Sequence, residues 1–112
     1  AKKEKQANAR PEILNKPENI DKYDTIFIGY PNWWGDMPMP VYTFLESYDF
    51  TNKTVIPFCT HEGSGMSGTQ NSVAKVTRAK EVKTGFALYG HIAQKNRQET
   101  EQKVTEWLNS IR

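Results

Sequence analysis

Two segments of the sequence hold the residues best suited to bind a ligand. The first, YPNWWGDMPMP at positions 30–40, places Trp33 and Trp34 side by side among three prolines and one glycine, which restrict the backbone. The second, THEGSGMSGTQ at positions 60–70, combines glycines with hydroxyl side chains and should leave backbone amides accessible. Flat aromatic surface beside accessible amides suits a planar, hydrogen-bonding ligand better than a phosphate alone.

Each segment follows a run of residues that predicts a buried strand. Residues 25–29 (TIFIG) and 54–59 (TVIPFC) are apolar and rich in β-branched and aromatic side chains, and residues 82–89 form a third such run. Pro57 lacks the N–H group that a sheet ladder needs, so it predicts a bulge or an edge-like position within the second strand.

Helical patterns separate and follow these strands. Asp36 could cap the first helix, and the spacing of Ser67 and Gln70 predicts a capping box for a second helix over 68–77. Asn96 and Glu99 repeat this spacing before a last helix. Residues at helical spacing predict the inward-facing stripes of the three helices, in order: Val41, Phe44, Leu45 and Tyr48; Val73 and Val76; Val104, Trp107, Leu108 and Ile111.

The order of these elements predicts an α/β fold. Strands and helices alternate as β-α-β-α-β-α, and each connection is long enough to return the chain for a parallel strand. Right-handed crossovers would place the helices on the faces of the sheet. Ligands of open parallel sheets bind beyond the carboxyl ends of the strands. Residues 30–38 and 60–69 should therefore be neighbours at one edge.

Length and charge narrow the class of protein further. A chain of 112 residues is one domain at most, and its net charge is +2. Residues 1–10 hold four basic side chains and one acidic one, so they carry +3 and the other residues carry −1. We therefore expect a polar tail and loop at 1–22, a folded domain at 23–112, and no basic face for nucleic acid. No apolar run approaches the ~20 residues of a membrane span, and a single cysteine fits a reducing, cytoplasmic location.

Other interpretations of the same residues remain open. Residues 63–68 also read G-x-G-x-x-G, as in dinucleotide-binding domains, but there this loop follows the first strand and an acidic residue closes the next. Trp33 and Trp34 could instead anchor their loop on the core. His61 and Glu62 could begin a metal site, although no second ligand pair has suitable spacing.

Several longer segments of the chain resemble those of bacterial flavodoxins of the short-chain, flavodoxin-like family. The resemblance rests on YDTIFIGYPNWWGDMPMPVYTFLESYDF, on KTVIPFCTHEGSGMSGT, and on the later ALYG and EQKVTEWL, and it covers roughly residues 9–111. It implies a doubly wound parallel sheet and a bound FMN. It also implies that the first loop lines the flavin ring from one side, through Pro31, Asn32, Trp33, Trp34 and Gly35. The second loop would surround the pyrimidine edge of the ring through the backbone amides of Thr60, His61, Glu62, Gly63, Ser64 and Gly65.

One part of the family pattern has no counterpart here. The family begins with a strand and a T/S-x-T-G-x-T loop that holds the FMN phosphate, and nothing in residues 1–22 matches it. The three predicted strands therefore correspond to the family's third, fourth and fifth, in a truncated fold that is either a C-terminal fragment or a naturally shortened protein. The strand at 25–29 would then be an exposed edge, which predicts a homo-oligomer joined through it.

Three functions follow from these expectations. The first is an FMN-binding electron carrier of the flavodoxin type, or the C-terminal part of one, served by a redox partner or reductase. The second is an FMN-dependent NAD(P)H:acceptor oxidoreductase on the same fold. The third is a fragment that binds no flavin and instead complements another chain or forms strand-swapped oligomers.

Overall fold

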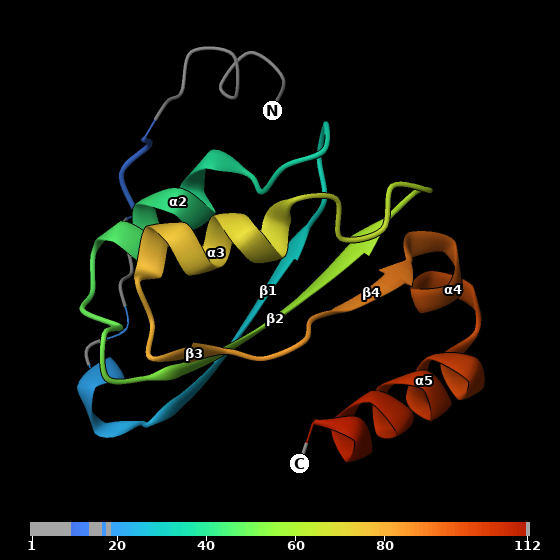
Figure 1. The fold of residues 1–112 in the computed structure, drawn as a ribbon. Coiled ribbons are helices and arrows are strands. Elements are labelled where there is room, and N and C mark those ends of the chain that lie inside the picture. The colour runs from blue at the N-terminus through green and yellow to red at the C-terminus, as the bar shows by residue number, and fades with distance from the viewer. Residues whose placement is uncertain (1–9, 14–16, 18, 112) are drawn as a thin grey trace.

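The computed structural model of the protein describes residues 10–13, 17 and 19–111 (Figure 1). It has the α/β architecture that the sequence predicts. The elements, in chain order, are η1 (Ile20–Lys22), β1 (Thr25–Pro31), α2 (Met39–Glu46), β2 (Thr54–His61), α3 (Thr69–Thr77), β3 (Glu81–Val82), β4 (Phe86–Tyr89), α4 (Gly90–Lys95) and α5 (Arg97–Ser110).

The strands form one parallel sheet with β2 at its centre. β1 pairs with β2 from Thr25 opposite Thr54 to Pro31 opposite Thr60, and β3 and β4 both pair with the other side of β2. The first two strands thus run two residues further than predicted, into the two segments predicted to bind a ligand. Among the described residues, no strand pairs with the outer edge of β1.

The predicted third strand is divided in two, and Pro57 accounts for the break. Three residues, 83–85, separate Val82 from Phe86, whereas two residues separate their partners Val55 and Phe58. The extra residue bulges out opposite Pro57, which has no N–H to donate. The prediction of a bulge or an edge-like position within the second strand is wrong, because β2 is continuous and central and the irregularity lies in the neighbouring strand.

The helices lie on both faces of this sheet (Figure 1). α2 and α3, which connect β1 to β2 and β2 to β3, cover one face, while α5, which follows the last strand, lies on the other. The main core lies under α2 and α3, where Leu45, Phe50, Val55 and Val73 are at most 1% exposed. The stripes predicted for these two helices pack on this core as expected.

Two of the three predicted helix caps are wrong. Asp36 lies two residues before the N-cap of α2, which is Pro38, and its Oδ1 accepts hydrogen bonds from Met37 N (2.8 Å) and Tyr42 Oη (2.5 Å). At α3 the N-cap is Gly68, because the hydroxyl of Ser67 donates to the carbonyl of Ser64 instead. At α5 the side chain of Asn96 accepts from the N–H of Glu99, as predicted.

The N-terminal expectations fall partly outside the described residues. Positions 1–9, 14–16 and 18 belong to the predicted tail and are not described, whereas Ile20–Lys22 form a short 3-10 helix. Arg10 forms an ion pair with Glu46 (2.8 Å), which brings this part of the chain onto α2. In the part of the chain that the structure describes, no helix is long and apolar enough to cross a membrane.

Candidate ligand-binding site

The two predicted binding segments meet at the carboxyl edge of the sheet. β1 and β2 end opposite one another, with Pro31 paired to Thr60. Directly after this pair, the N–H of Asn32 donates to the carbonyl of Thr60 (2.7 Å). The residues between β1 and α2 and those between β2 and α3 therefore form adjacent walls, which we call the tryptophan loop (residues 32–38) and the glycine loop (residues 62–68).

The tryptophan loop is held by a tight turn. Trp33 and Asp36 exchange two backbone hydrogen bonds of 2.8 and 3.0 Å, and the two residues between them, Trp34 and Gly35, have φ of 56° and 76°. Positive φ at both central positions is typical of a type I′ turn. For a bulky residue such as Trp34 this region is strained by about 1 kcal/mol or more. The turn displays both indoles, which are 47% and 60% exposed at Trp33 and Trp34.

The glycine loop presents its backbone. Gly63, Gly65 and Ser67 all have positive φ, at 135°, 63° and 51°, so the chain reverses direction repeatedly. Five consecutive backbone N–H groups donate no hydrogen bond to any described residue: those of Ser64, Gly65, Met66, Ser67 and Gly68. Such a series of amides can donate to the heteroatoms of a ring or to an anion.

Asn32 connects the two loops. Its Nδ2 donates to the carbonyl of Gly65 (2.8 Å) and to the hydroxyl of Ser67 (2.9 Å). Its Oδ1 is buried and has no hydrogen-bond partner among the described residues. Buried acceptors without a donor are rare, since each costs about 1–3 kcal/mol. This atom is therefore an acceptor that a donor group of a ligand could satisfy.

A third segment, missed by the sequence analysis, borders the glycine loop. Tyr89 at the end of β4 places its ring 4.4 Å from the ring of His61, between centroids. A Cβ at Gly90 would lie 2.3 Å from Oε1 of Glu62, so the first residue of α4 must be small to accommodate this carboxylate. The signal was present, because the third strand ends at the same sheet edge as the other two. His61 is 9% exposed, and its Nδ1 accepts from the N–H of Gly63 (2.9 Å).

A buried hydrogen-bonded chain supports both loops from below. The hydroxyl of Tyr30 donates to Oγ1 of Thr69 (2.9 Å), which donates to the carbonyl of Met66 (2.6 Å). Burial raises the pKa of Tyr30 to about 12, although the hydrogen bond to Thr69 lowers it. Burial also raises the pKa of Cys59, so its thiol is neutral and packs as a small hydrophobic group.

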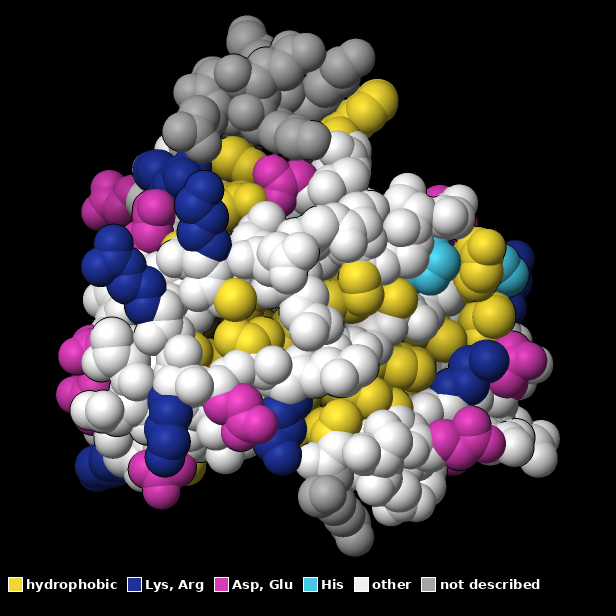
Figure 2. Space-filling view, in the orientation of Figure 1, with side chains coloured by type: hydrophobic (Ala, Val, Ile, Leu, Met, Phe, Trp, Pro, Cys, Tyr) yellow, Lys and Arg dark blue, Asp and Glu magenta, His cyan; other side chains and the backbone are white. Residues whose placement is uncertain are grey.

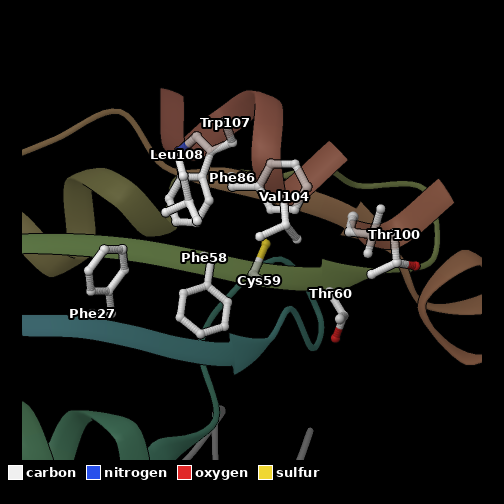
Figure 3. A pocket seen from close by; sticks show the side chains of 10 residues that line it. Phe27, Phe58, Cys59, Thr60, Phe86, Thr100, Val104, Trp107 and Leu108 are labelled. Carbon is white, nitrogen blue, oxygen red and sulfur yellow. The ribbon is translucent and has the colours of Figure 1, made fainter. Parts of the chain in front are cut away.

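An apolar groove lies apart from these loops, beneath α5 (Figure 3). It has a volume of about 540 Å³ and is lined by Phe27, Phe58, Cys59, Thr60, Phe86, Leu88, Thr100, Val104, Trp107 and Leu108. Trp107 was expected in the core; it is half-buried, stacks on Phe86 at 5.1 Å and donates from Nε1 to the carbonyl of Thr84 (3.0 Å).

An open parallel sheet with ligand-binding loops at its carboxyl edge defines the class of doubly wound α/β proteins. The model of a flavodoxin family matches residues 2–111. The chain therefore belongs to the flavodoxin family.

Similar solved structures agree with this assignment. A Bacteroides eggerthii protein named a flavoprotein is 37% identical with a TM-score of 0.74, over 92% of this chain and 60% of its own. A Bacteroides uniformis protein of the same name is 34% identical with a TM-score of 0.70, over 87% of this chain and 60% of its own. A Lactobacillus acidophilus flavoprotein in complex with FMN is 26% identical with a TM-score of 0.60, over 85% of this chain and 64% of its own. The chain thus spans three-fifths of the length of the two Bacteroides proteins. Comparison with curated proteins finds no match.

Proposed function

We propose that this chain binds FMN between the tryptophan loop and the glycine loop and serves as a flavodoxin-type electron carrier. The observation that carries the proposal is the placement of two exposed indoles beside a series of backbone amides that donate to no described residue, in a chain of the flavodoxin family. The complex of the Lactobacillus acidophilus protein with FMN supports the choice of flavin.

The residues present fit the ring of this cofactor. Its flat face needs an aromatic surface, which Trp33 or Trp34 supplies, and its pyrimidine edge needs donors and an acceptor. The amides of Ser64 and Gly65 are donors of this kind, and the buried Oδ1 of Asn32 is an acceptor without a partner. Pro31, Gly35 and Thr60 would shape the slot, while His61, Glu62 and Gly63 would border the pyrimidine edge.

Bound FMN would supply the redox chemistry by accepting and donating electrons at its ring. The part of this chain is to hold the ring, exclude water from one face and set the charge around it. Glu62 is the acidic side chain of the glycine loop, whereas Asp36 is occupied by Met37 and Tyr42. A redox partner or reductase would deliver the electrons, since a carrier does not turn over substrate by itself.

The direct test is titration of the purified chain with FMN, followed by quenching of flavin fluorescence. Loss of one stacking surface removes about 0.5–1.5 kcal/mol, so Trp33→Ala or Trp34→Ala should weaken binding about 2- to 10-fold. Tyr23→Ala is the matched control, because Tyr23 is an exposed aromatic residue (58%) outside both loops. Absence of saturable quenching in the unsubstituted chain would contradict the proposal.

Riboflavin tests how the phosphate is held. Residues 10–13, 17 and 19–22 provide no loop of the family's phosphate-binding type, so riboflavin should bind nearly as tightly as FMN. A strong preference for FMN would instead assign the phosphate to the amides ahead of α3, between Gly63 and Gly68.

Turnover of NAD(P)H distinguishes an electron carrier from the alternative function, an FMN-dependent oxidoreductase. A carrier should oxidise NAD(P)H only when a reductase is added, whereas an enzyme would do so with FMN and an acceptor alone. Steady NAD(P)H oxidation by the flavin-loaded chain without a reductase would favour the enzyme.

A further inference from the structure

The start of the glycine loop is held by the ring of His61. The backbone N–H of Gly63 donates to Nδ1 of His61 (2.9 Å), and it donates to no backbone acceptor in the part of the chain that the structure describes. Gly63 has φ of 135°, so this hydrogen bond fixes a turn of the backbone that favours glycine, where the chain leaves β2. The amides of Ser64 and Gly65, the proposed donors to the pyrimidine edge of the flavin, follow directly after this turn.

The later part of the glycine loop is held by a side chain of another kind. Nδ2 of Asn32 donates to the carbonyl of Gly65 (2.8 Å) and to the hydroxyl of Ser67 (2.9 Å). An amide side chain does not titrate, whereas histidine is the side chain that ordinarily changes its charge between about pH 5 and 8. The loop therefore depends on a titratable group at its start and on a group without charge further along.

The hydrogen bond from Gly63 requires a neutral imidazole. A neutral ring has one nitrogen that accepts and one that donates, whereas both nitrogens of a charged ring donate. With Nδ1 of His61 as the acceptor, the proton of the neutral ring is on Nε2. After protonation, the N–H at Nδ1 would face the N–H of Gly63, and rotation of the ring would bring no acceptor into its place. The bond is therefore present while His61 is neutral and is lost as the pH falls and the ring becomes charged.

The ring of His61 is enclosed, whereas Gly63 is exposed. His61 is 9% exposed, and its ring lies 4.4 Å from that of Tyr89 on β4, between centroids. The ring of Tyr89 in turn lies 5.1 Å from that of His91 on α4. Figure 2 shows the two histidines of the chain on either side of hydrophobic side-chain atoms. Since the ring is packed and Gly63 borders solvent, protonation would displace the loop rather than the ring.

The titratable groups around His61 come from the glycine loop, β4 and α4. Glu62 is the next residue, and its carboxylate lies against Gly90 at the start of α4. This carboxylate and the π-electrons of Tyr89 attract a charged imidazole, while a charged His91 repels it. These contacts affect the charge of the ring, but none of them gives the N–H of Gly63 another acceptor.

We propose that the neutral ring of His61 positions the start of the glycine loop, so that Ser64 and Gly65 present their amides to the flavin, and that protonation of His61 releases this part of the loop. His61 is thus a positioning residue, which acts on the flavin through Gly63. Flavin binds more weakly at acidic than at neutral pH. The choice of ligand rests on the proposed function, whereas the hydrogen bond itself can be measured without a ligand.

The first test needs no flavin. In 1H–15N NMR spectra of the chain, the amide signal of Gly63 should shift between about pH 8 and 5 with the same midpoint as the ring signals of His61. His61→Asn keeps an acceptor for the N–H two residues further on, as in an Asx turn, but does not titrate. In this variant the signal of Gly63 should be independent of pH. A Gly63 signal that does not follow the ring of His61 in the unsubstituted chain would overturn the proposal.

The second test measures the affinity for riboflavin, because the phosphate of FMN would itself titrate near about pH 6. Riboflavin should bind about 3- to 10-fold more weakly at pH 5.5 than at pH 8, the effect of losing one hydrogen bond. His61→Ala should have the lower affinity at both pH values. His61→Asn should restore most of the affinity that His61→Ala loses, and its affinity should not depend on pH.

His91→Asn is the matched control, because His91 also contacts Tyr89, whereas the N–H of Gly63 donates to His61. This variant should keep the pH dependence of the unsubstituted chain, and circular dichroism establishes that all variants remain folded. Loss of the pH dependence in His91→Asn, or its persistence in His61→Asn, would overturn the proposal. If riboflavin and FMN bind at neither pH, the proposed function fails, and the signal of Gly63 still decides whether His61 positions the loop.

Discussion

The two faces of the sheet differ sharply, although the same strands build both. Beneath α2 and α3, side chains such as Leu45, Phe50 and Val73 are at most 1% exposed. Beneath α5, Phe27 and Phe58 remain 48% and 39% exposed, and the groove stays open. Hydrophobicity alone therefore does not bury a residue in this chain; it also needs an element that covers its face.

The two faces of the sheet also contribute differently to the stability of the fold. Close packing concentrates the folding free energy on the α2–α3 face, because dispersion and burial act only where partners touch. The open face contributes less to stability, because its side chains have fewer partners. The tryptophan and glycine loops lie at the edge that both faces share. Tyr30, buried on the covered side, is linked through Thr69 to Met66 of the glycine loop.

The largest expected effect comes from removing a side chain on the covered face. Phe50 is fully buried, with its ring 6.3 Å from those of Phe44 and Tyr48, so Phe50→Ala should lower the free energy of unfolding by about 3–5 kcal/mol. Phe58→Ala on the open face should lower it by less than about 1.5 kcal/mol. Urea unfolding of both variants measures the contrast, and equal losses would show that the two faces are equally packed.

An effect of intermediate size on the free energy of unfolding should come from the ionisation of Tyr30, which is buried on the covered side of the sheet. Tyr30 holds its proton more tightly when folded, because its pKa rises from 10.0 to about 12. Its contribution to stability is complete below pH 10 and is lost as the pH rises towards 12, since the unfolded chain ionises first. The loss should be about 2 kcal/mol. Tyr30→Phe should remove this loss from the difference in urea stability between pH 9.5 and 11.5; an unchanged slope would contradict the assignment.

A smaller effect should follow from a substitution on the open face. Trp107→Phe removes the hydrogen bond from Nε1 to Thr84 and should lower the unfolding free energy by about 1 kcal/mol. Because the ring contacts and the hydrogen bond of Trp107 involve none of the residues of the two loops, the affinity for FMN and its reduction potential should not change. A shift in the potential of the bound flavin would show instead that the groove and the ligand-binding edge are coupled.

The smallest effect is expected on the reduction potential of a bound flavin, from a substitution of Glu62 at the carboxyl edge of the sheet. Reduction leaves the flavin ring more negative, so the carboxylate of Glu62 should oppose it. Glu62→Gln should raise the potential by roughly 20–40 mV, because the carboxylate lies against Gly90 and is partly screened. Spectroelectrochemistry of the flavin-loaded chain measures this shift. Asp36→Asn is the comparison, since Asp36 bonds to Tyr42 and should leave the potential unchanged.

The sequence by itself determined the alternation of strands and main helices and the position of the two loops, but not η1, α4 or the division of the third strand. Apolar runs with β-branched residues, and stripes at helical spacing, are local signals that depend on burial alone. They located the first two strands to within two residues, because β1 and β2 extend to Pro31 and His61, whereas the third strand is divided into β3 and β4. The resemblance to flavodoxins rested on the content of those loops, and the family assignment confirms it.

Only the tertiary structure decided how those residues are used. Asp36 accepts from Tyr42 and from the N–H of Met37 rather than capping α2, because the N-cap falls at Pro38 and the Tyr42 hydroxyl of α2 itself reaches back to this carboxylate. Tyr89 and Gly90 reach the glycine loop because β4 is placed beside β2, which no local pattern encodes. The open groove arises in the same way: the stripe of α5 is ordinary in sequence, and whether it is buried depends on which elements cover the sheet beside it.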